Sequence, residues 1–203
     1  FDVIDALVPG WDTATPAEAL LVLAEKMAQA LPAPRPARRL YVDVSIVAKD
    51  DIKTGIQRVV RALTQALLQN PPPGYRVEPV SLSDAGGAWR YRLAPTYALA
   101  LLGGQRSDPT DDAGIDVQHG DVVLALDFAG SMLTQAAAQG LFRRIRDQGG
   151  RCHGVVYDLL PVLMPDVFPP GAADEHLKWL QVIGSLDGAI CISHAVADDL
   201  RAW

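Results

Sequence analysis

The feature that most constrains the fold is an alternation of short apolar runs with longer amphipathic stretches. Apolar runs rich in β-branched residues occur at 40–47, 75–82, 121–126, 151–157 and 188–192. Between and after them, apolar residues recur with helical spacing at 55–69, 132–148, 171–186 and from 194 onward. Strands that alternate with helices form βαβ units, whose right-handed crossovers place helices on both faces of a parallel sheet. The sequence therefore predicts an α/β protein with a Rossmann-like open parallel sheet.

A helix signal near the N-terminus divides the chain into two parts. Thr15 and Glu18 form a capping box, which predicts a helix that ends before the proline-rich stretch at 31–36. We therefore expect residues 1–36 to be a helical extension with a stiff linker. Residues 37–203 are expected to form the Rossmann-like domain.

One part of the expected domain lacks regular periodicity. Residues 83–118 are rich in Gly, Pro and Asp, which is typical of loops and turns. We expect a loop-rich insert there, with one short helix near 95–102. At least two of its three embedded aromatic residues, Trp89, Tyr91 and Tyr97, are expected in the core.

Composition and motifs argue against several functional classes. The formal net charge of −6 argues weakly against a nucleic-acid partner, which needs a basic face. No run of about 18 apolar residues is present in the sequence, so no membrane span is expected. The four histidines are scattered, so no metal site is expected. The glycine pattern of dinucleotide-binding proteins and the Gly-Lys-Ser/Thr of phosphate-binding loops are both missing, so no NAD cofactor is expected.

Candidate site residues follow the predicted strands, because ligands of open α/β sheets bind outside the carboxyl ends of their strands. These residues are Thr54, Gly55, Ile56 and Arg58, then Asp127 and Phe128, then Tyr157 and Asp158, and finally Ser193 and His194. Gly55 permits close approach of a ligand, and the helix start behind it favours an anion such as a diphosphate. Asp127 and Asp158 are suited to bind sugar hydroxyls or to assist proton transfer.

Several of these assignments have a structural alternative that the sequence leaves open. A single glycine at a helix start, such as Gly55, is common without any ligand. Asp127 and Asp158 are equally suited to cap the turns that follow their strands. Ser193 is most simply the N-cap of the last helix, and Arg58 fits a solvated helix face.

Three motifs in register resemble family-four glycosyltransferases. The segment 54–61, TGIQRVVR, resembles the "TGI-x-R" opening of the first helix in that family. The segment from Val156 to Phe168 is similar to its "HDL-x-P…P…F" motif, with Tyr157 where the family often has histidine. Residues 190–200 are similar to its "ISxxSxxDL" motif. The resemblance covers residues 40–203.

This resemblance implies the N-terminal half of a GT-B fold, in which two Rossmann-like domains face each other across a cleft. The N-terminal domain usually holds the acceptor, and transfer retains the anomeric configuration. The nucleotide-sugar, a GDP-, UDP- or dTDP-sugar, is usually held without a metal by a C-terminal domain that carries a Glu-x7-Glu segment. That domain is expected to be missing from this chain, so we expect the 203 residues alone to be inactive.

Roles carry over by position, as implications of the resemblance. Thr54, Gly55, Ile56 and Arg58 would lie near the donor phosphates. The residues that would line the acceptor side of the cleft are Asp127, Phe128, Tyr157, Asp158, Ser193 and His194. No residue is assigned as catalytic.

Family members whose motifs resemble the TGIQR and DLLP segments of this chain build O-antigen, capsule or other bacterial surface polysaccharide. Mannose or rhamnose donors and a glycan or lipid-linked glycan acceptor are therefore expected. The expected location is the cytoplasm, with peripheral contact at the inner membrane as a further option. Two other functions stay open: a nucleotide-sugar epimerase of GT-B fold, and a non-catalytic α/β module that binds a glycan or a partner protein.

Overall fold

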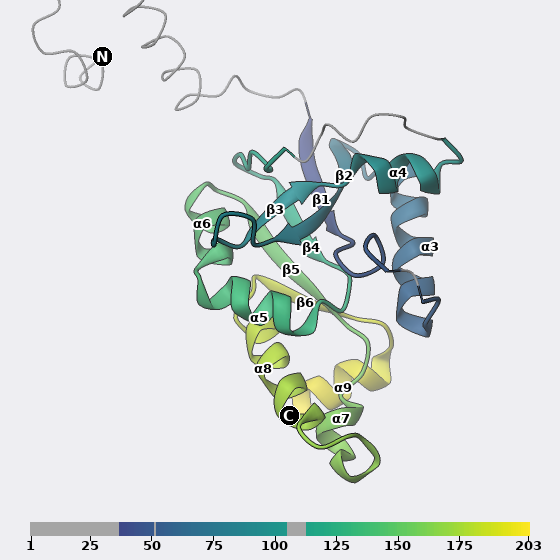
Figure 1. Ribbon diagram of the computed structural model, residues 1–203, viewed down its shortest axis with the longest axis vertical. Coiled ribbons are helices and arrows are strands. Elements are labelled where there is room, and N and C mark those ends of the chain that lie inside the picture. The colour runs from purple at the N-terminus through teal and green to yellow at the C-terminus, as the bar shows by residue number, and fades with distance from the viewer. Residues whose placement is uncertain (1–36, 51, 105–112) are drawn as a thin grey trace, which may run out of the picture. The chain divides into compact units, whose positions relative to one another are not determined.

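The computed structural model describes residues 37–50, 52–104 and 113–203, in which strands and helices alternate (Figure 1). In chain order, the elements are β1 (Arg38–Asp43), α3 (Gly55–Gln69), β2 (Tyr75–Ser83), β3 (Arg90–Leu93), α4 (Pro95–Leu101), β4 (Val122–Ala125), α5 (Gly130–Ala138), α6 (Leu141–Asp147), β5 (Arg151–Val156), α7 (Leu160–Leu163), the 3₁₀ helix η1 (Pro165–Val167), α8 (Ala172–Gly184), β6 (Gly188–Cys191) and α9 (His194–Ala202). The helix and linker predicted within residues 1–36 lie outside the described residues.

The strands form one six-stranded sheet in the order β3-β2-β1-β4-β5-β6. All neighbouring strands are parallel except β2 and β3, which pair antiparallel at one edge. The chain therefore winds from β1 toward β2 in one direction and from β4 through β6 in the other. The predicted α/β class and Rossmann-like open sheet are confirmed, with one antiparallel edge strand as an addition.

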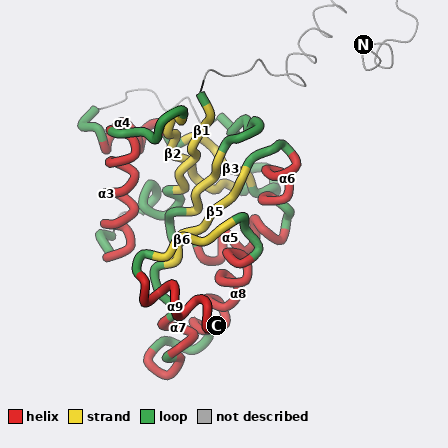
Figure 2. The backbone as a smooth tube through the Cα atoms, turned by 180° about the vertical axis from the view of Figure 1, so that it is seen from behind, coloured by secondary structure: helices red, strands yellow, loops and turns green. Residues whose placement is uncertain are grey.

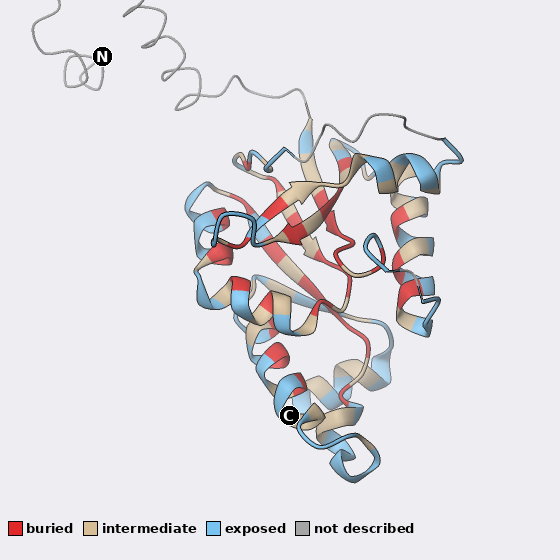
Figure 3. Cartoon of the chain, viewed as in Figure 1, coloured by how far each residue is buried: buried red, intermediate tan, exposed pale blue. Residues whose placement is uncertain are grey.

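Two hydrophobic layers sandwich the sheet, as expected for parallel strands covered on both faces. Helices α3 and α4 lie on one side, while α5, α6 and α8 lie on the other (Figure 2). Successive residues of β1 point to opposite layers, so Tyr41 belongs to the layer that contains Leu133 and Trp179, whereas Val42 belongs to the layer that contains Val60. Figure 3 shows the buried residues along the central strands and the inward faces of the helices.

Helix α3 begins as its capping box predicts. The Thr54 hydroxyl accepts the Gln57 backbone N–H, and the Gln57 side chain accepts the Thr54 N–H, both at 3.2 Å. The Gln57 amide also donates to the Asp50 carbonyl at 2.6 Å. These bonds satisfy groups that a helix start leaves unpaired, and they tie the helix to the loop before it.

Three predicted elements differ in the structure. The insert contains the strand β3, in which Arg90 is exposed and Tyr91 buried, besides the predicted short helix α4. The helix predicted at 132–148 is split into α5 and α6 at Gly140, whose φ of 76° suits glycine. The loop predicted after Asp158 contains the two short helices α7 and η1. Trp89 and Tyr91 are buried, which confirms that at least two of the insert's aromatic residues lie in the core.

Strand β1 is also shorter than predicted, because the side chain of Asp43 ends it. The Asp43 carboxylate accepts the Ser45 backbone N–H at 2.8 Å and the Ser45 hydroxyl. Such a local bond offers the backbone a turn in place of the strand. The chain after Asp43 therefore folds into turns that lead toward α3.

Close packing of α8 on β5 depends on Gly154. A Cβ atom at this position would meet the Cδ1 and Cγ2 atoms of Ile183 at less than van der Waals distance. We expect Gly154→Ala to lower the free energy of unfolding by about 1–3 kcal/mol, the usual cost of overpacking a core. Urea denaturation measures this. Gly184→Ala is the matched control, because a Cβ there meets nothing within 4 Å, and equal stability of the two variants would contradict the prediction.

Candidate functional site

The candidate site lies where four parallel strands end. Strands β1, β4, β5 and β6 are parallel to one another, so their carboxyl ends share one edge of the sheet (Figure 1). We call the segments 53–58, 127–130, 157–161 and 193–194 at this edge the rim. The rim contains every site residue that the sequence predicted. The structure distributes these residues among a cavity, a buried clamp, a helix start and a second hollow.

A cavity of about 320 Å³ brings together four of the predicted residues, which are Ile56, Phe128, Tyr157 and Asp158. It also includes residues of α7 and α8 and of the segment before α8. The walls thus come from three of the four rim segments and from α8. Cavities of roughly this size or larger hold most small ligands.

Three aromatic rings pack against one another at this cavity. The ring centroids of Phe128 and Trp179 lie 5.0 Å apart at an angle of 69°, which is an edge-to-face arrangement. His176 lies 5.0 Å from Trp179 and 5.6 Å from Phe128, again between centroids. We call these three residues the aromatic cluster. Buried edge-to-face pairs contribute about 0.5–1.5 kcal/mol beyond their buried area, so the cluster is a rigid wall.

Sequence reasoning missed His176 and Trp179 as residues of the site. Both lie on the buried face of α8, which continues with Leu180 and Ile183. The imidazole Nε2 of His176 lies 3.1 Å from the Asp158 carbonyl oxygen, so the ring fixes the backbone after β5. The helical spacing of α8 indicates only burial, and it does not reveal that the buried face begins at the rim.

Asp127 is a buried clamp that holds the loop after β1. One carboxylate oxygen accepts the backbone N–H groups of Ile46 and Val47, each at 2.8 Å. The other oxygen accepts the N–H of Phe128 at 2.9 Å. Burial raises the pKa of Asp127, while these three hydrogen bonds lower it. The geometry therefore matches the turn-capping alternative that the sequence left open for this residue.

Asp43 lies beneath the clamp and is completely buried. Besides Ser45, its carboxylate accepts the Tyr91 hydroxyl at 2.9 Å. Burial raises the pKa of Asp43 to about 7, mainly because the charged form loses its hydration, and the nearby charge of Asp127 raises it further. Asp43 is thus partly protonated near neutral pH, whereas three backbone N–H groups favour the ionised form of Asp127.

The hydroxyl group of Tyr157 is already bound inside the protein. It donates to the Leu126 carbonyl oxygen at 2.7 Å, and burial raises its pKa above the ordinary value. Tyr157 is therefore a neutral donor at physiological pH and presents its ring to the cavity. In this position it differs from a histidine, which titrates near neutrality.

The start of α3 is an exposed part of the rim. Thr54, Gly55 and Arg58 are exposed there, and the first turn of the helix carries no acidic residue. A Cβ at Gly55 would meet nothing within 4 Å, so no described part of the chain requires glycine at this position. Lys53 has a φ of 60°, a left-handed conformation that costs a lysine roughly 1–2 kcal/mol. Strained residues of this kind cluster at functional sites.

Ser193 and His194 lie apart from the aromatic cluster. Ser193 caps α9, because its hydroxyl accepts the Val196 N–H at 3.2 Å. Together with Arg201 of α9, these two residues line a separate hollow of about 480 Å³. The structure thus confirms the predicted N-cap and places His194 in the same separate hollow as Ser193.

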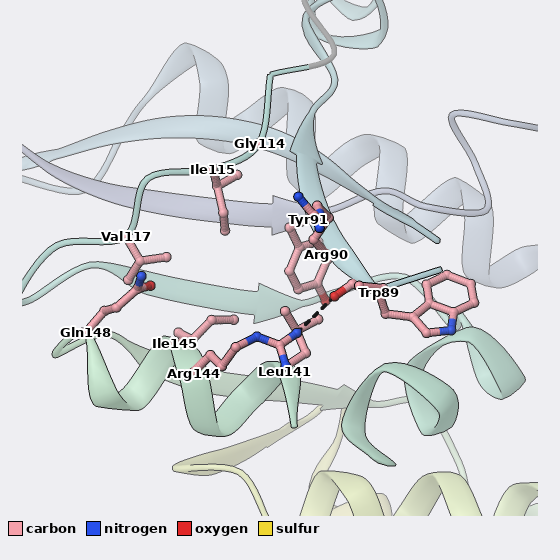
Figure 4. A pocket seen from close by; sticks show the side chains of 11 residues that line it. Trp89, Arg90, Tyr91, Gly114, Ile115, Val117, Leu141, Arg144, Ile145 and Gln148 are labelled. Atoms are coloured by element: carbon pink, nitrogen blue, oxygen red, sulfur yellow. Dashed lines mark hydrogen bonds between the residues drawn. The ribbon is translucent and has the colours of Figure 1, made fainter. Parts of the chain in front are cut away.

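Two further cavities of the described part of the chain are lined by no rim residue. One, of about 340 Å³, lies between β3 and α6, and Figure 4 shows Arg144 reaching across it to the Trp89 carbonyl oxygen at 3.0 Å. The other is an apolar groove of about 540 Å³ between α3 and β4–β6, flanked by the half-exposed side chains of Leu63, Ile190 and Ile192. In the first cavity, the guanidinium group of Arg144 is already bound to a backbone carbonyl oxygen. The second cavity is lined by apolar side chains and offers almost no polar group.

A metal-binding cluster and a membrane-spanning helix are both missing from the described residues. Residues 37–50, 52–104 and 113–203 contain no group of three His, Cys, Asp or Glu side chains arranged to hold a metal ion. None of the helices described is long and apolar enough to cross a bilayer.

Comparison with known proteins gives one consistent result. No family model matches the chain. Three curated relatives from Escherichia coli, each named serotype-specific mannosyltransferase WbdA, are 33%, 33% and 32% identical over 170, 167 and 170 residues. Over this segment the chain is homologous to a glycosyltransferase. The matches cover 82–83% of this chain, which spans about one fifth of the length of these relatives.

Proposed function

We propose that the chain is the acceptor-side domain of a retaining bacterial glycosyltransferase of GT-B fold, which transfers mannose from a nucleotide-sugar to a glycan. The observation that carries this proposal is the identity of 33% over 170 residues to a serotype-specific mannosyltransferase. The Rossmann-like sheet supports it, since its rim gathers the candidate residues at the edge where ligands of such sheets bind.

Two parts of the rim take different roles in this proposal. The start of α3, with Thr54, Gly55, Ile56 and Arg58, faces the donor diphosphate. Its free N–H groups, the helix dipole and the missing acidic residues of its first turn all favour an anion. The acceptor side is formed by Phe128, Tyr157 and Asp158 of the cavity, and by Ser193 and His194 of the separate hollow.

Asp127 contributes to this site through the backbone. Its three hydrogen bonds fix the loop between β1 and α3, so it positions the helix start and does not face the acceptor. Stabilisation of the departing diphosphate is the largest catalytic contribution in such transfers. In this proposal it comes mainly from a second, nucleotide-sugar-binding domain of the same polypeptide.

The proposed biological role is synthesis of a bacterial surface polysaccharide, either O-antigen or capsule. Support comes from the name of the relatives, because serotype-specific enzymes differ where surface glycans differ. The reaction would take place in the cytoplasm, with peripheral contact at the inner face of the membrane where a lipid-linked acceptor is presented.

A transfer assay tests this function. The complete gene product that contains this chain is incubated with GDP-mannose, UDP-glucose or dTDP-rhamnose, with and without a mannose-ended oligosaccharide. Extension of the oligosaccharide with retained configuration, by GDP-mannose alone, is the expected result, and the 203-residue chain is expected to give none. Conversion of the donor without acceptor would instead indicate an epimerase. No reaction with any donor, by a folded gene product, would indicate a binding module.

Gly55→Ala separates the structural from the functional role of this glycine. Because nothing surrounds a Cβ there, alanine is expected to stabilise the helix by about 0.4–1 kcal/mol. If a diphosphate approaches this backbone, the same methyl group lowers kcat/KM of the gene product about tenfold or more. Urea denaturation and steady-state kinetics measure the two effects. Increased stability with undiminished kcat/KM would contradict the assigned role, and Gly184→Ala on α8 is the matched control.

A further inference from the structure

One residue that lines the rim cavity carries a buried hydrogen-bond donor without a partner in the described residues. Trp179 lines this cavity and is only 2% exposed. Its indole Nε1–H has no hydrogen-bond partner among the described residues. A buried donor without a partner costs about 1–3 kcal/mol, so it is rare in proteins and calls for an explanation. An acceptor oxygen supplied by a ligand in the cavity would satisfy it.

The walls of the cavity suit the apolar face of a sugar ring. The aromatic cluster of Phe128, His176 and Trp179 presents rings that are held rigidly against one another. The C–H groups on one face of a pyranose pack against such rings, while its hydroxyl groups point to the polar edge. Asp158 provides that polar edge, with a carboxylate that accepts only the Leu160 N–H among the described hydrogen bonds.

Charge narrows the class of ligand further. Asp158 is the charged side chain that lines the cavity, and no lysine or arginine is among the described residues that line it. A phosphate or a sugar carboxylate would meet this acidic group without a counter-charge, at a Coulomb cost that the low-dielectric wall increases. The volume of about 320 Å³ lies at the lower end of the range for small-ligand sites, which suits a single monosaccharide.

We infer that this cavity binds one uncharged sugar ring of the acceptor, with its apolar face on the aromatic cluster and a hydroxyl oxygen at the indole N–H of Trp179. That the sugar belongs to the acceptor rests on the proposed function. That the ligand is an uncharged sugar ring rests on the lining of the cavity itself. Trp179 is then a specificity residue that recognises a hydroxyl group, while Asp158 excludes anionic sugars.

Binding is tested on the 203-residue chain labelled with ¹⁵N. Its four tryptophans give four indole N–H signals, of which the Trp179 signal is the one missing from Trp179→Phe. Methyl α-mannoside, added up to ~50 mM to detect a Kd in the range of about 1–10 mM, is expected to shift the Trp179 signal saturably. The signals of Trp89 and Trp203 are internal controls that should stay in place. Mannose 6-phosphate is expected to bind at least tenfold more weakly.

Two variants examine the roles of single groups. Trp179→Phe keeps a ring and removes the N–H, so mannoside affinity is expected to fall about fivefold, the effect of one neutral hydrogen bond. Asp158→Asn is expected to bring the affinity for mannose 6-phosphate closer to the affinity for methyl α-mannoside. Trp203→Phe is the matched control, because Trp203 is half-exposed and does not line the cavity, so this variant should keep its affinity.

The outcomes separate this inference from the proposed function. A Trp179 signal that no neutral sugar moves, in a folded chain, overturns the inference even if the gene product transfers mannose. Equal binding of mannose 6-phosphate also overturns it. If the gene product shows no transfer but the Trp179 signal responds as expected, the sugar subsite stands and the glycosyltransferase proposal fails.

Discussion

Replacing Asp127 by alanine is expected to lower the free energy of unfolding by about 3–5 kcal/mol, because it leaves the N–H groups of Ile46, Val47 and Phe128 without their acceptor. Each buried donor that loses its partner costs about 1–3 kcal/mol. A water molecule that enters the space of the carboxylate would recover part of this. The effect is large against a total stability of about 5–15 kcal/mol for a domain.

Asp127→Asn sharpens this prediction. Both carboxylate oxygens accept N–H groups, so either orientation of the asparagine amide places its NH₂ group against a backbone donor. We therefore expect Asn to destabilise the protein nearly as much as Ala, although the shape is unchanged. Asp158→Asn is the control, since Asp158 is only half-buried and accepts a single backbone N–H.

Urea denaturation at pH 7 measures the two Asp127 variants and the control. Wild-type stability of Asp127→Asn would show that the loop finds other acceptors and that the clamp is dispensable. A loss of activity in a destabilised Asp127 variant would not by itself identify a catalytic group, because the variant also loosens the segment that leads to α3.

The free energy of unfolding is expected to fall by up to ~4 kcal/mol between about pH 4 and pH 7, through Asp43. Its pKa is raised from 3.8 to about 7 in the folded protein, chiefly by burial. Between these two values the folded state holds a proton that the unfolded state has released. Stability therefore decreases as pH rises, by about 1.4 kcal/mol per pH unit, and levels off above pH 7. The raised pKa of Asp127 acts in the same direction.

Asp43→Asn tests this pH dependence. The amide oxygen can keep the bonds from Ser45, and the NH₂ group can donate to the Tyr91 hydroxyl, so the variant imitates protonated Asp43. We expect wild type and variant to be similarly stable at pH 5 and the variant to be more stable at pH 8. Urea midpoints from pH 4 to pH 8 measure both. A wild-type stability that rises over this range, or an unchanged slope in the variant, would contradict the prediction.

Local sequence signals predicted the scaffold of the fold well. The apolar runs located five strands, and the capping residues Thr54 and Ser193 marked two helix starts correctly. The strand β3 was not predicted, because an edge strand of four residues with two arginines has no continuous apolar run. The division of the predicted helix at Gly140 was not predicted, because one glycine inside a helical pattern is often tolerated.

The candidate site was predicted only as far as the strand ends define it. The rule for parallel sheets located Phe128, Tyr157 and Asp158 at one cavity. The partners of a buried group depend on contacts between distant segments, which no local pattern contains. The sequence therefore left Asp127 open between a ligand-facing carboxylate and a turn cap, since two of its three partners lie 80 and 81 residues away. Trp179 likewise looked like an ordinary core residue.

The loop between β1 and α3 has a thermodynamic consequence for binding. Asp127 holds it at Ile46 and Val47, and Gln57 holds it at Asp50, all within the protein itself. A segment ordered in this way loses little conformational freedom when a substrate arrives, whereas a free loop would lose about 1–2 kcal/mol for each residue that becomes fixed. The free energy of contacts that a ligand makes at the start of α3 can therefore contribute almost fully to its affinity, because little of it is lost in ordering the loop.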